Sequence, residues 1–279
     1  MAIKKKTAPR AQKKSKKKPR LTAKTADRHA LYQQSVQDPK EEVRVLTRMF
    51  RKHRARAPLS LREDFCGTAL LCAEWVKANP QNTATGIDID KEVLGWGKQH
   101  NILPLGEPAE RVQLLAQNVM KAVRRKHDII CGFNFSYWIF QDRPSLRNYF
   151  KTARAGLNRD GLLILDAFGG WEANQLMSEM RTVKGFKYIW DQDSFDPING
   201  IAVNHIHFEF PDGTRLNEAF SYTWRHWTLP ELQELLLEAG FSKVTVYWDV
   251  SDNDDVEDYR PRKVAENQPG WLAYIIAEP

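Results

Sequence analysis

Residues 59–90 read LSLREDFCGTALLCAEWVKANPQNTATGIDID, and this stretch decides the fold. It contains two short apolar runs, 59–65 and 83–89, each of a length typical of a buried strand. Between them, Ala69–Ala78 is amphipathic and is followed by Asn79-Pro80, which predicts a helix that ends there. A strand, a helix and a second strand in this order predict two parallel strands of an α/β sheet.

The same alternation continues along the chain in both directions. Upstream, Asp38-Pro39-Lys40-Glu41 is a capping box with proline at the first helical position, so a helix should begin there. Downstream we expect helices at 91–100 and about 144–157, strands at 112–116, 127–133 and 162–168, a helix from Thr228 to Gly240, and final strands at 241–250 and 271–277. The pattern predicts a Rossmann-like, doubly wound α/β sheet of seven strands.

The rhythm changes after strand five. Three strand-like runs, 184–190, 201–210 and 216–227, follow one another without helices between them. Pro211-Asp212-Gly213 is a hairpin turn signal between the last two runs. We therefore expect an antiparallel β insertion over residues 182–228, placed where a sheet of this class would gain a lid.

The charge of the chain is unevenly distributed. The 279 residues carry a formal net charge of +7, but residues 1–20 hold eight Lys, two Arg and no acid. That segment contributes +10, so the remaining 259 residues sum to −3. Residues 1–25 contain almost no large apolar side chains and are predicted to be a disordered tail, with one domain over 26–279. The tail is either a solvated segment or a non-specific contact to nucleic acid or ribosomes.

The cysteines and the apolar runs bear on the compartment. Cys66, Cys72 and Cys131 are odd in number and show no C-x-x-C spacing, which favours buried thiols in a reducing cytoplasm over disulfides or zinc. No apolar run reaches the roughly 18 residues that a membrane span needs. We expect a soluble, cytoplasmic protein without a metal site.

Polar residues follow the first two predicted strands. Gly67 lies in the turn after the first strand, where a small residue lets backbone N–H groups approach a ligand. Asp88 ends the second strand, 21 residues after Gly67. An acid at about this spacing can hold a ribose, because its two oxygens accept both hydroxyl groups of the diol.

Several motifs in this order resemble those of the class I S-adenosylmethionine-dependent methyltransferases. The matching segments are Glu63-x-x-Cys66-Gly67-Thr68, Gly86-Ile87-Asp88, Gln117-Asn118-Val119, Asp128-Ile129-Ile130, 160–166 and 229–241, and the resemblance covers about residues 27–279. More narrowly, 31–37 with 62–68 resembles a poorly characterised bacterial subgroup with some likeness to glycine N-methyltransferase-type enzymes. Two features depart from the family pattern. Phe65 and Ala69 flank a single Gly67 where three glycines usually alternate, and Asn118 replaces a common Asp.

The resemblance implies roles for individual residues. Glu63 would approach the methionine amino group of the cofactor, Gly67 would admit its amino-acid part, and Asp88 would bind the ribose. Either Arg62 or Tyr32 would meet the cofactor carboxylate. The full set of predicted cofactor-binding residues is Tyr32, Arg62, Glu63, Cys66, Gly67, Asp88, Ile89, Asn118, Val119 and Asn134, with Asn118 and Val119 at the adenine and Cys66 most simply a packing residue.

The acceptor is less well defined by the sequence. Methyl transfer mainly requires positioning and desolvation, so no compact catalytic triad is expected, and we assign no catalytic residue. The substrate candidates are Phe135, Tyr137, Asp166 and Arg225. The first choice of activity is S-adenosylmethionine-dependent methylation of a small-molecule amine, hydroxyl or carboxylate. The alternatives are an RNA- or ribosome-directed methyltransferase that docks through its tail, and a non-catalytic cofactor-binding protein that binds nucleic acid.

Two further patterns are weak signals of function. Asn134-Phe135-Ser136-Tyr137 faintly resembles the Asn-Pro-Pro-Tyr motif of enzymes that methylate planar amino nitrogens, but both prolines are missing. His205-x-His207 would place two imidazoles on one face of a strand. No third ligand has recognisable spacing, so we interpret these histidines as surface or core residues.

Overall fold

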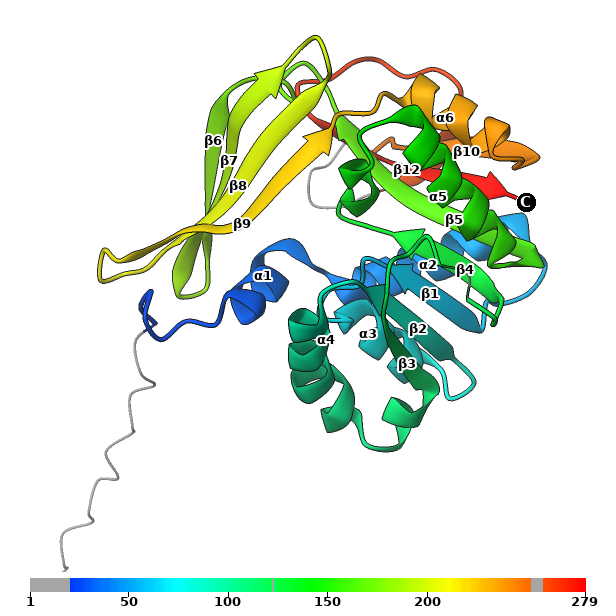
Figure 1. The fold of residues 1–279 in the computed structure, drawn as a ribbon, viewed down its shortest axis with the longest axis horizontal. Coiled ribbons are helices and arrows are strands. Elements are labelled where there is room, and N and C mark those ends of the chain that lie inside the picture. The colour runs from blue at the N-terminus through cyan, green and yellow to red at the C-terminus, as the bar shows by residue number, and fades with distance from the viewer. Residues whose placement is uncertain (1–20, 122, 252–257) are drawn as a thin grey trace, which may run out of the picture.

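The computed structural model describes residues 21–121, 123–251 and 258–279 (Figure 1). Residues 1–20, most of the predicted tail, lie outside this range. Residues 21–25, by contrast, form a turn in which Leu21 and Ala23 pack against the insertion, and the Ala23 N–H donates to Thr214 Oγ1 at 3.0 Å. The described residues therefore include the last five of the predicted tail.

The main sheet has eight strands in the order β11-β10-β12-β5-β4-β1-β2-β3. Their bounds are β1 Ser60–Asp64, β2 Thr83–Asp88, β3 Val112–Ala116, β4 His127–Gly132, β5 Leu157–Gly169, β10 Lys243–Asp249, β11 Tyr259–Arg262 and β12 Trp271–Glu278. Strands β1 to β5 are parallel, whereas β12 and β10 run antiparallel to their neighbours. The doubly wound sheet is confirmed.

The eighth strand, β11, is absent from the sequence prediction. It has four residues and pairs only with β10, at the edge of the sheet. Pro261 lies within it, and a proline argues against a strand unless the strand is at an edge, where its missing N–H costs no ladder bond. Sequence reasoning therefore had no signal for this strand.

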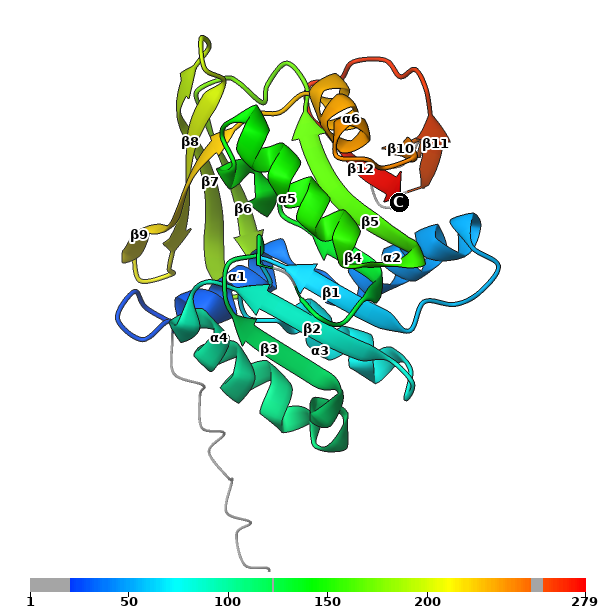
Figure 2. The same ribbon diagram turned by 45° about the vertical axis from the view of Figure 1, so that its right-hand side comes forward.

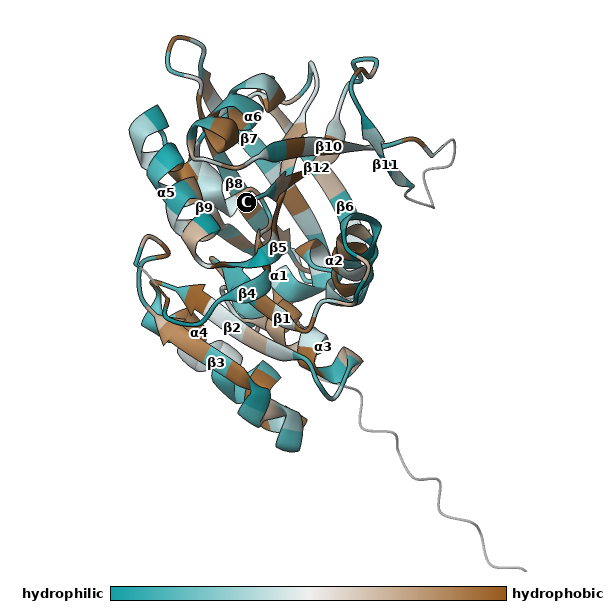
Figure 3. Ribbon diagram, turned by 90° about the vertical axis from the view of Figure 1, so that its right-hand side faces the viewer, coloured by the Kyte–Doolittle hydropathy of each residue, from teal (hydrophilic) through white to brown (hydrophobic). Residues whose placement is uncertain are grey.

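Helices cover both faces of the main sheet. Their bounds are α1 Arg28–Val36, α2 Pro39–His53, α3 Leu70–Ala78, α4 Lys91–Gly97, α5 Arg143–Ala155 and α6 Leu229–Glu238. Helices α2, α3 and α4 share one core with Ile129, and α5 and α6 share a second core with Ile130. Figure 3 shows the apolar residues concentrated in the strands and a polar outer face on α5. Both predicted helix starts are confirmed, since Asp38 accepts from the Glu41 N–H and Thr228 forms a full capping box with Glu231. At Asp38 the box is incomplete, because the Glu41 carboxylate pairs with Arg44 instead of returning to the cap.

The insertion is a four-stranded antiparallel sheet rather than the three strands predicted. Its strands are β6 Met177–Val183, β7 Phe186–Asp196, β8 Ile201–Glu209 and β9 Arg215–Arg225. Strand β6 was missed because it is mostly exposed and lacks an apolar alternation, so the insertion begins at 177 rather than 182. Figures 1 and 2 show the insertion and α1 together beyond the main sheet. Leu31 of α1 packs against Ile206 and Phe208 of β8.

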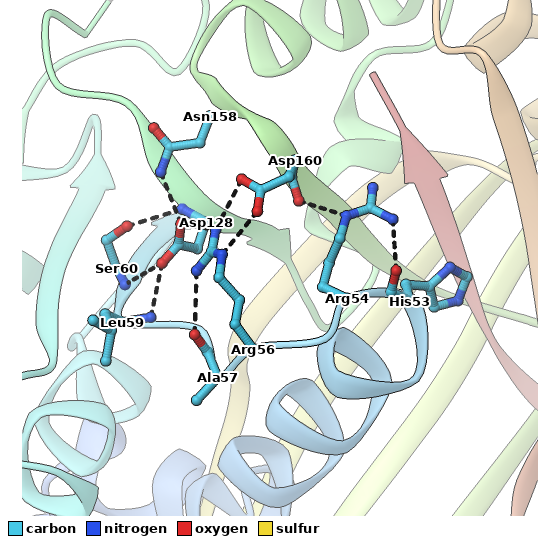
Figure 4. A network of polar contacts seen from close by, with 9 residues as sticks. All are labelled: His53, Arg54, Arg56, Ala57, Leu59, Ser60, Asp128, Asn158 and Asp160. Atoms are coloured by element: carbon cyan, nitrogen blue, oxygen red, sulfur yellow. Dashed lines mark hydrogen bonds and ion pairs between the residues drawn. The ribbon is translucent and has the colours of Figure 1, made fainter.

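A polar network lies at the amino-terminal ends of the parallel strands, where β1, β4 and β5 begin (Figure 4). Arg56 donates to Asp128 at 2.7 Å and to both oxygens of Asp160 at 2.8 Å. The second oxygen of Asp128 accepts from Leu59 and Ser60 N–H groups. This network ties the segment between α2 and β1 to the starts of β4 and β5, and thereby fixes where β1 begins.

Candidate cofactor and acceptor site

The loop after β1 has an unusual backbone. Phe65, Gly67 and Ala69 all adopt left-handed conformations, with φ of 58°, 50° and 54°. For the two residues with a side chain, this conformation costs about 1–2 kcal/mol each. The chain thus follows an alternating left-handed path although only one of the three positions is glycine. Strain of this kind persists where the surrounding structure fixes it, and here it falls at the carboxyl end of β1, the ligand edge of doubly wound sheets.

Several hydrogen bonds hold this loop. The Gly67 N–H donates to Asp88 Oδ2 at 2.8 Å, and Gln33 Nε2 donates to Thr68 Oγ1 at 2.6 Å. From the other side, Asn101 Nδ2 donates to the Thr68 carbonyl at 2.8 Å. A Cβ at Gly97 would lie 2.3 Å from that carbonyl oxygen, so α4 approaches the loop closely. A Cβ at Gly67 would meet nothing within 4 Å, so this part of the loop faces open space that a ligand can enter.

The predicted ribose and adenine residues lie together. Asp88 ends β2, and its second oxygen accepts from the Asp90 N–H at 2.9 Å. The Gln117 N–H donates to the Asp88 carbonyl at 2.9 Å, which joins the third turn to the second. Ile89 is 71% exposed beside Asp88, and Asn118 is exposed with its Oδ1 accepting from the Met120 N–H. Val119 is buried, so its side chain contributes to the floor of this region.

Buried and half-buried carboxylates gather at the same edge without basic ion-pair partners among the described residues. Glu63 is 6% exposed and accepts from the N–H and Sγ of Cys72 at 3.2 and 3.1 Å. Burial raises its pKa to about 8, and the nearby Glu42 carboxylate adds to this. Burial and the charge of Asp166 raise the pKa of Glu42 to about 7. Among the described residues, no Lys or Arg forms an ion pair with Glu42, Glu63, Asp88 or Asp166, so this edge favours a cationic ligand.

Asp166 is held by the turn after β4. It accepts from the Asn134 and Phe135 N–H groups at 2.7 and 3.1 Å, and both of these residues have left-handed backbones. Burial nevertheless raises the pKa of Asp166 to about 7. The structure therefore brings three of the predicted residues, Asn134, Phe135 and Asp166, into direct contact. Tyr32 reaches the same region from α1, with its ring 4.9 Å from that of Phe220 on the insertion.

Two predicted residues are fully buried, and a third is engaged in an ion pair. Arg62 is fully buried and forms a bidentate ion pair with Asp64 at 2.7 and 3.0 Å, because side chains alternate along β1 and Glu63 takes the other face. Tyr137 is also fully buried, and its hydroxyl supports the Asp166 carbonyl from below at 2.7 Å. Arg225 pairs with Glu231 at 2.9 Å and lies over the Trp227 ring. The predictions that Arg62 binds the cofactor and that Tyr137 contacts the substrate are therefore corrected, whereas substrate contact by the partly exposed Arg225 stays a prediction.

Cys66 is a packing residue rather than a ligand contact. Its thiol is buried, and a Cβ at Gly86 would lie only 2.9 Å from its Sγ. Glu42, in the first turn of α2, is not among the residues predicted from the sequence. Acids in a first helical turn normally stabilise the helix from the surface, so its position gave no sign that it would be buried beside Glu63.

Two hollows of different character lie near the insertion. A cavity of about 230 Å³ opens between the end of β5 and the insertion, with Phe135 among its lining residues. A larger hollow of about 1120 Å³ lies between α6, β10 and residues 261–267, and none of the sequence-predicted residues lines it. The smaller cavity is the better candidate for a binding site, because it adjoins Asp166 through Phe135. Among the described residues, no cluster of three His, Cys, Asp or Glu side chains is placed to hold a metal ion.

These features define an α/β protein with a ligand edge at the carboxyl ends of β1, β2, β4 and β5. No protein-family model matches the sequence, and no curated protein matches it significantly. Solved structures do share the fold. A S-adenosylmethionine-dependent methyltransferase from Clostridium acetobutylicum aligns with a TM-score of 0.67 and 16% identity, over 89% of this chain and 96% of that one.

Two further structures are sugar-modifying enzymes. The amino pentose methyltransferase CalS10 of Micromonospora echinaspora, solved with S-adenosylmethionine, has a TM-score of 0.64 and 12% identity over 90% of this chain and 96% of its own. The sugar N-methyltransferase KedS8 of a Streptoalloteichus species has a TM-score of 0.62 and 14% identity over 98% and 99%. This chain therefore has the fold of S-adenosylmethionine-dependent methyltransferases. The narrower likeness to glycine N-methyltransferase-type enzymes stays a prediction.

One negative finding concerns membranes. No helix in the part of the chain that the structure describes is long and apolar enough to cross one.

Proposed function

We propose that this protein is a S-adenosylmethionine-dependent methyltransferase that acts on a small molecule. The observation that carries the proposal is the contact between Gly67 and Asp88 at an edge where four carboxylates have no basic partner among the described residues. The cofactor is cationic at its sulfonium and at its amino group, so it fits a site of this charge. When bound, it supplies an electrophilic methyl group.

The residues divide the binding among them. Asp88 would accept the ribose hydroxyls, since each of its oxygens keeps a free lone pair after the bond from Gly67 or Asp90. Glu63 and Glu42 would face the amino group, where a positive charge offsets their burial. Ile89 and Asn118 would border the adenine, and Tyr32 is the remaining candidate for the carboxylate. The insertion would exclude water from the reacting atoms.

Calorimetry on the full-length chain tests the cofactor assignment. We expect S-adenosylmethionine to bind with a dissociation constant in the micromolar range. Absence of heat on titration into folded protein would overturn the proposal. Incubating cell extract with methyl-labelled cofactor and the protein, and then sorting the label by molecular size, tests the acceptor class. Label in small molecules supports the proposal, whereas label in RNA would support the tail-docking alternative instead.

A further inference from the structure

The 230 Å³ cavity beside Asp166 has a distinctive lining. Its walls are Phe135 and Phe168 from the main domain, Trp190 and Gln192 from β7, Trp271 from β12, the carboxylates Glu172 and Glu179, and the smaller residues Gly169, Ala173, Met177 and Gly270. No Lys, Arg or His is among these lining residues. Aromatic faces with carboxylates and no base form an environment that attracts a cation and repels an anion.

Phe135 connects this cavity to Asp166. Its ring lines the cavity, and its backbone N–H donates to Asp166 Oδ1 at 3.1 Å. Asp166 is 6% exposed and forms no ion pair within the described residues. The two backbone N–H bonds fix its carboxylate, and burial raises its pKa to about 7. A buried carboxylate of this kind gains most from a ligand that brings a positive charge.

The inner face of the insertion supplies a second, independent indication of a ligand. Asn204 is 3% exposed, and its Nδ2 donates to no group among the described residues. It lies in register between Gln192, which lines the cavity, and Tyr222. The Tyr222 and Trp224 rings stack at 4.5 Å, and Trp190 lies 6.3 and 6.2 Å from them. An amide donor left unpaired in such surroundings destabilises the folded chain unless a ligand accepts its bond.

We propose that the methyl acceptor is an amine that enters as a cation and binds in this cavity, between Asp166 and the aromatic side chains of the insertion. This inference rests on the proposed function and narrows it to one of the three acceptor classes. Trp190 and Phe135 would contact the charged nitrogen, and Asn204 would donate to an oxygen elsewhere on the substrate. A carboxylate acceptor would be repelled by Glu172, Glu179 and Asp166, and a neutral hydroxyl would gain nothing from them.

Methyl transfer to this amine requires that its nitrogen first lose a proton. The ammonium gives a proton to the Asp166 carboxylate, which frees the nitrogen lone pair. That lone pair forms a bond to the methyl carbon while the bond between carbon and sulfur breaks, and its electron pair stays on sulfur. The positive charge passes from sulfur to the methylated nitrogen. Asp166 releases its proton to solvent when the product leaves.

Choline and its neutral isostere 3,3-dimethylbutan-1-ol test the charge recognition directly, because they share a shape and differ in charge. By calorimetry on the full-length protein, we expect choline to bind at least tenfold more tightly than the alcohol. Asp166→Asn and Trp190→Leu should each weaken choline binding at least fivefold. The matched control Glu110→Gln, at an exposed residue remote from the cavity, should change it less than twofold. Equal affinity for the two probes would overturn the inference.

Two measurements keep the outcomes separate. S-adenosylmethionine binding to the same samples is titrated independently, so loss of cofactor binding contradicts the proposed function, and loss of choline discrimination contradicts only the amine site. If Asp166→Asn fails to fold, the double variant Glu172→Gln/Glu179→Gln decides the question, because both residues lie at the cavity wall. It should weaken choline binding by about threefold, and unchanged binding would contradict the proposal.

Discussion

Acidic residues lie at both ends of the parallel strands of the main sheet, which we call its amino-terminal and carboxyl-terminal edges. The pKa values of these acids are shifted in opposite directions at the two edges. At the amino-terminal edge, burial would raise the pKa of Asp128, but hydrogen bonds led by that of Arg56 lower it to about 2. The pKa of Glu278 is also about 2. Burial would raise it, but hydrogen bonds from Arg54, Lys243 and His53 lower it. At the carboxyl-terminal edge, burial raises the pKa of Glu63 to about 8 and that of Asp166 to about 7.

The difference separates acids that stabilise the folded chain from acids that are available to a ligand. The acids of the amino-terminal edge have their counter-charges within the chain, so they stabilise the folded state. At the carboxyl-terminal edge Asp64 is paired with Arg62, but Glu63 and Asp166 have no basic ion-pair partner among the described residues, so their burial lowers stability until a ligand provides a counter-charge. Buried acids without a counter-charge indicate a functional site, and this indication is independent of the sequence motifs.

The largest expected effect is at the paired edge. Asp128→Ala removes the acceptor of Arg56, Leu59, Ser60 and Asn158. We expect the free energy of unfolding, measured by urea denaturation, to fall by about 3 kcal/mol. Glu41→Ala, at an exposed pair with Arg44, should change it by less than about 0.5 kcal/mol. Equal effects of the two substitutions would remove the distinction between the network and ordinary surface pairs.

The next effect is the pH dependence of the unpaired edge. Glu63 keeps its proton in the folded chain to about pH 8, whereas the unfolded chain releases it near 4.5. The folded state therefore binds more protons in this window, and the free energy of unfolding falls as pH rises from about 4.5 to 8. Glu63→Gln should make that fall smaller, with Glu42 and Asp166 accounting for what remains. Identical pH profiles for the two proteins would show that Glu63 is not protonated.

A smaller effect is expected on cofactor affinity. Asp88→Ala should weaken S-adenosylmethionine binding at least tenfold, or about 1.4 kcal/mol, because the ribose hydroxyls lose their acceptor. Glu92→Ala on the exposed side of α4 serves as the control and should change affinity less than twofold. Calorimetry measures both, and an unaffected Asp88→Ala variant would place the ribose elsewhere.

The smallest effect concerns the basic segment. Deleting residues 1–20 should leave S-adenosylmethionine affinity unchanged within twofold, because every contact described at the site involves residues beyond Leu21. The same deletion removes ten positive charges and should abolish any salt-dependent RNA retention. A tenfold loss of cofactor affinity on deletion would show that the segment belongs to the site.

The residues that sequence reasoning located correctly have local signatures. Asp38 and Thr228 cap their helices in the expected way, because capping depends on residues three positions apart. Gly67 and Asp88 were found because the ends of neighbouring parallel strands meet at one edge of a sheet. The hydrogen bond between them follows from that geometry.

The residues that it misplaced or missed depend on distant neighbours. Alternation along β1 requires Arg62 and Glu63 to face opposite ways, but only the packing of helices on the sheet decides which of them faces the ligand. In the structure Arg62 is buried and forms an ion pair with Asp64. Edge strands β6 and β11 have too little apolar pattern to be recognised, since exposed or peripheral strands bury little.

The doubly wound order, the helix starts and the motif positions could be predicted from the sequence, because each depends on hydrophobic period and on residues close along the chain. Two findings needed the folded structure: among the described residues, Glu42, Glu63 and Asp166 share one edge without a basic ion-pair partner, and the Nδ2 of the buried Asn204 donates no hydrogen bond. The reason is physical, since the free energy of a charge or an amide depends on what surrounds it, and its surroundings come from chain segments more than a hundred residues apart.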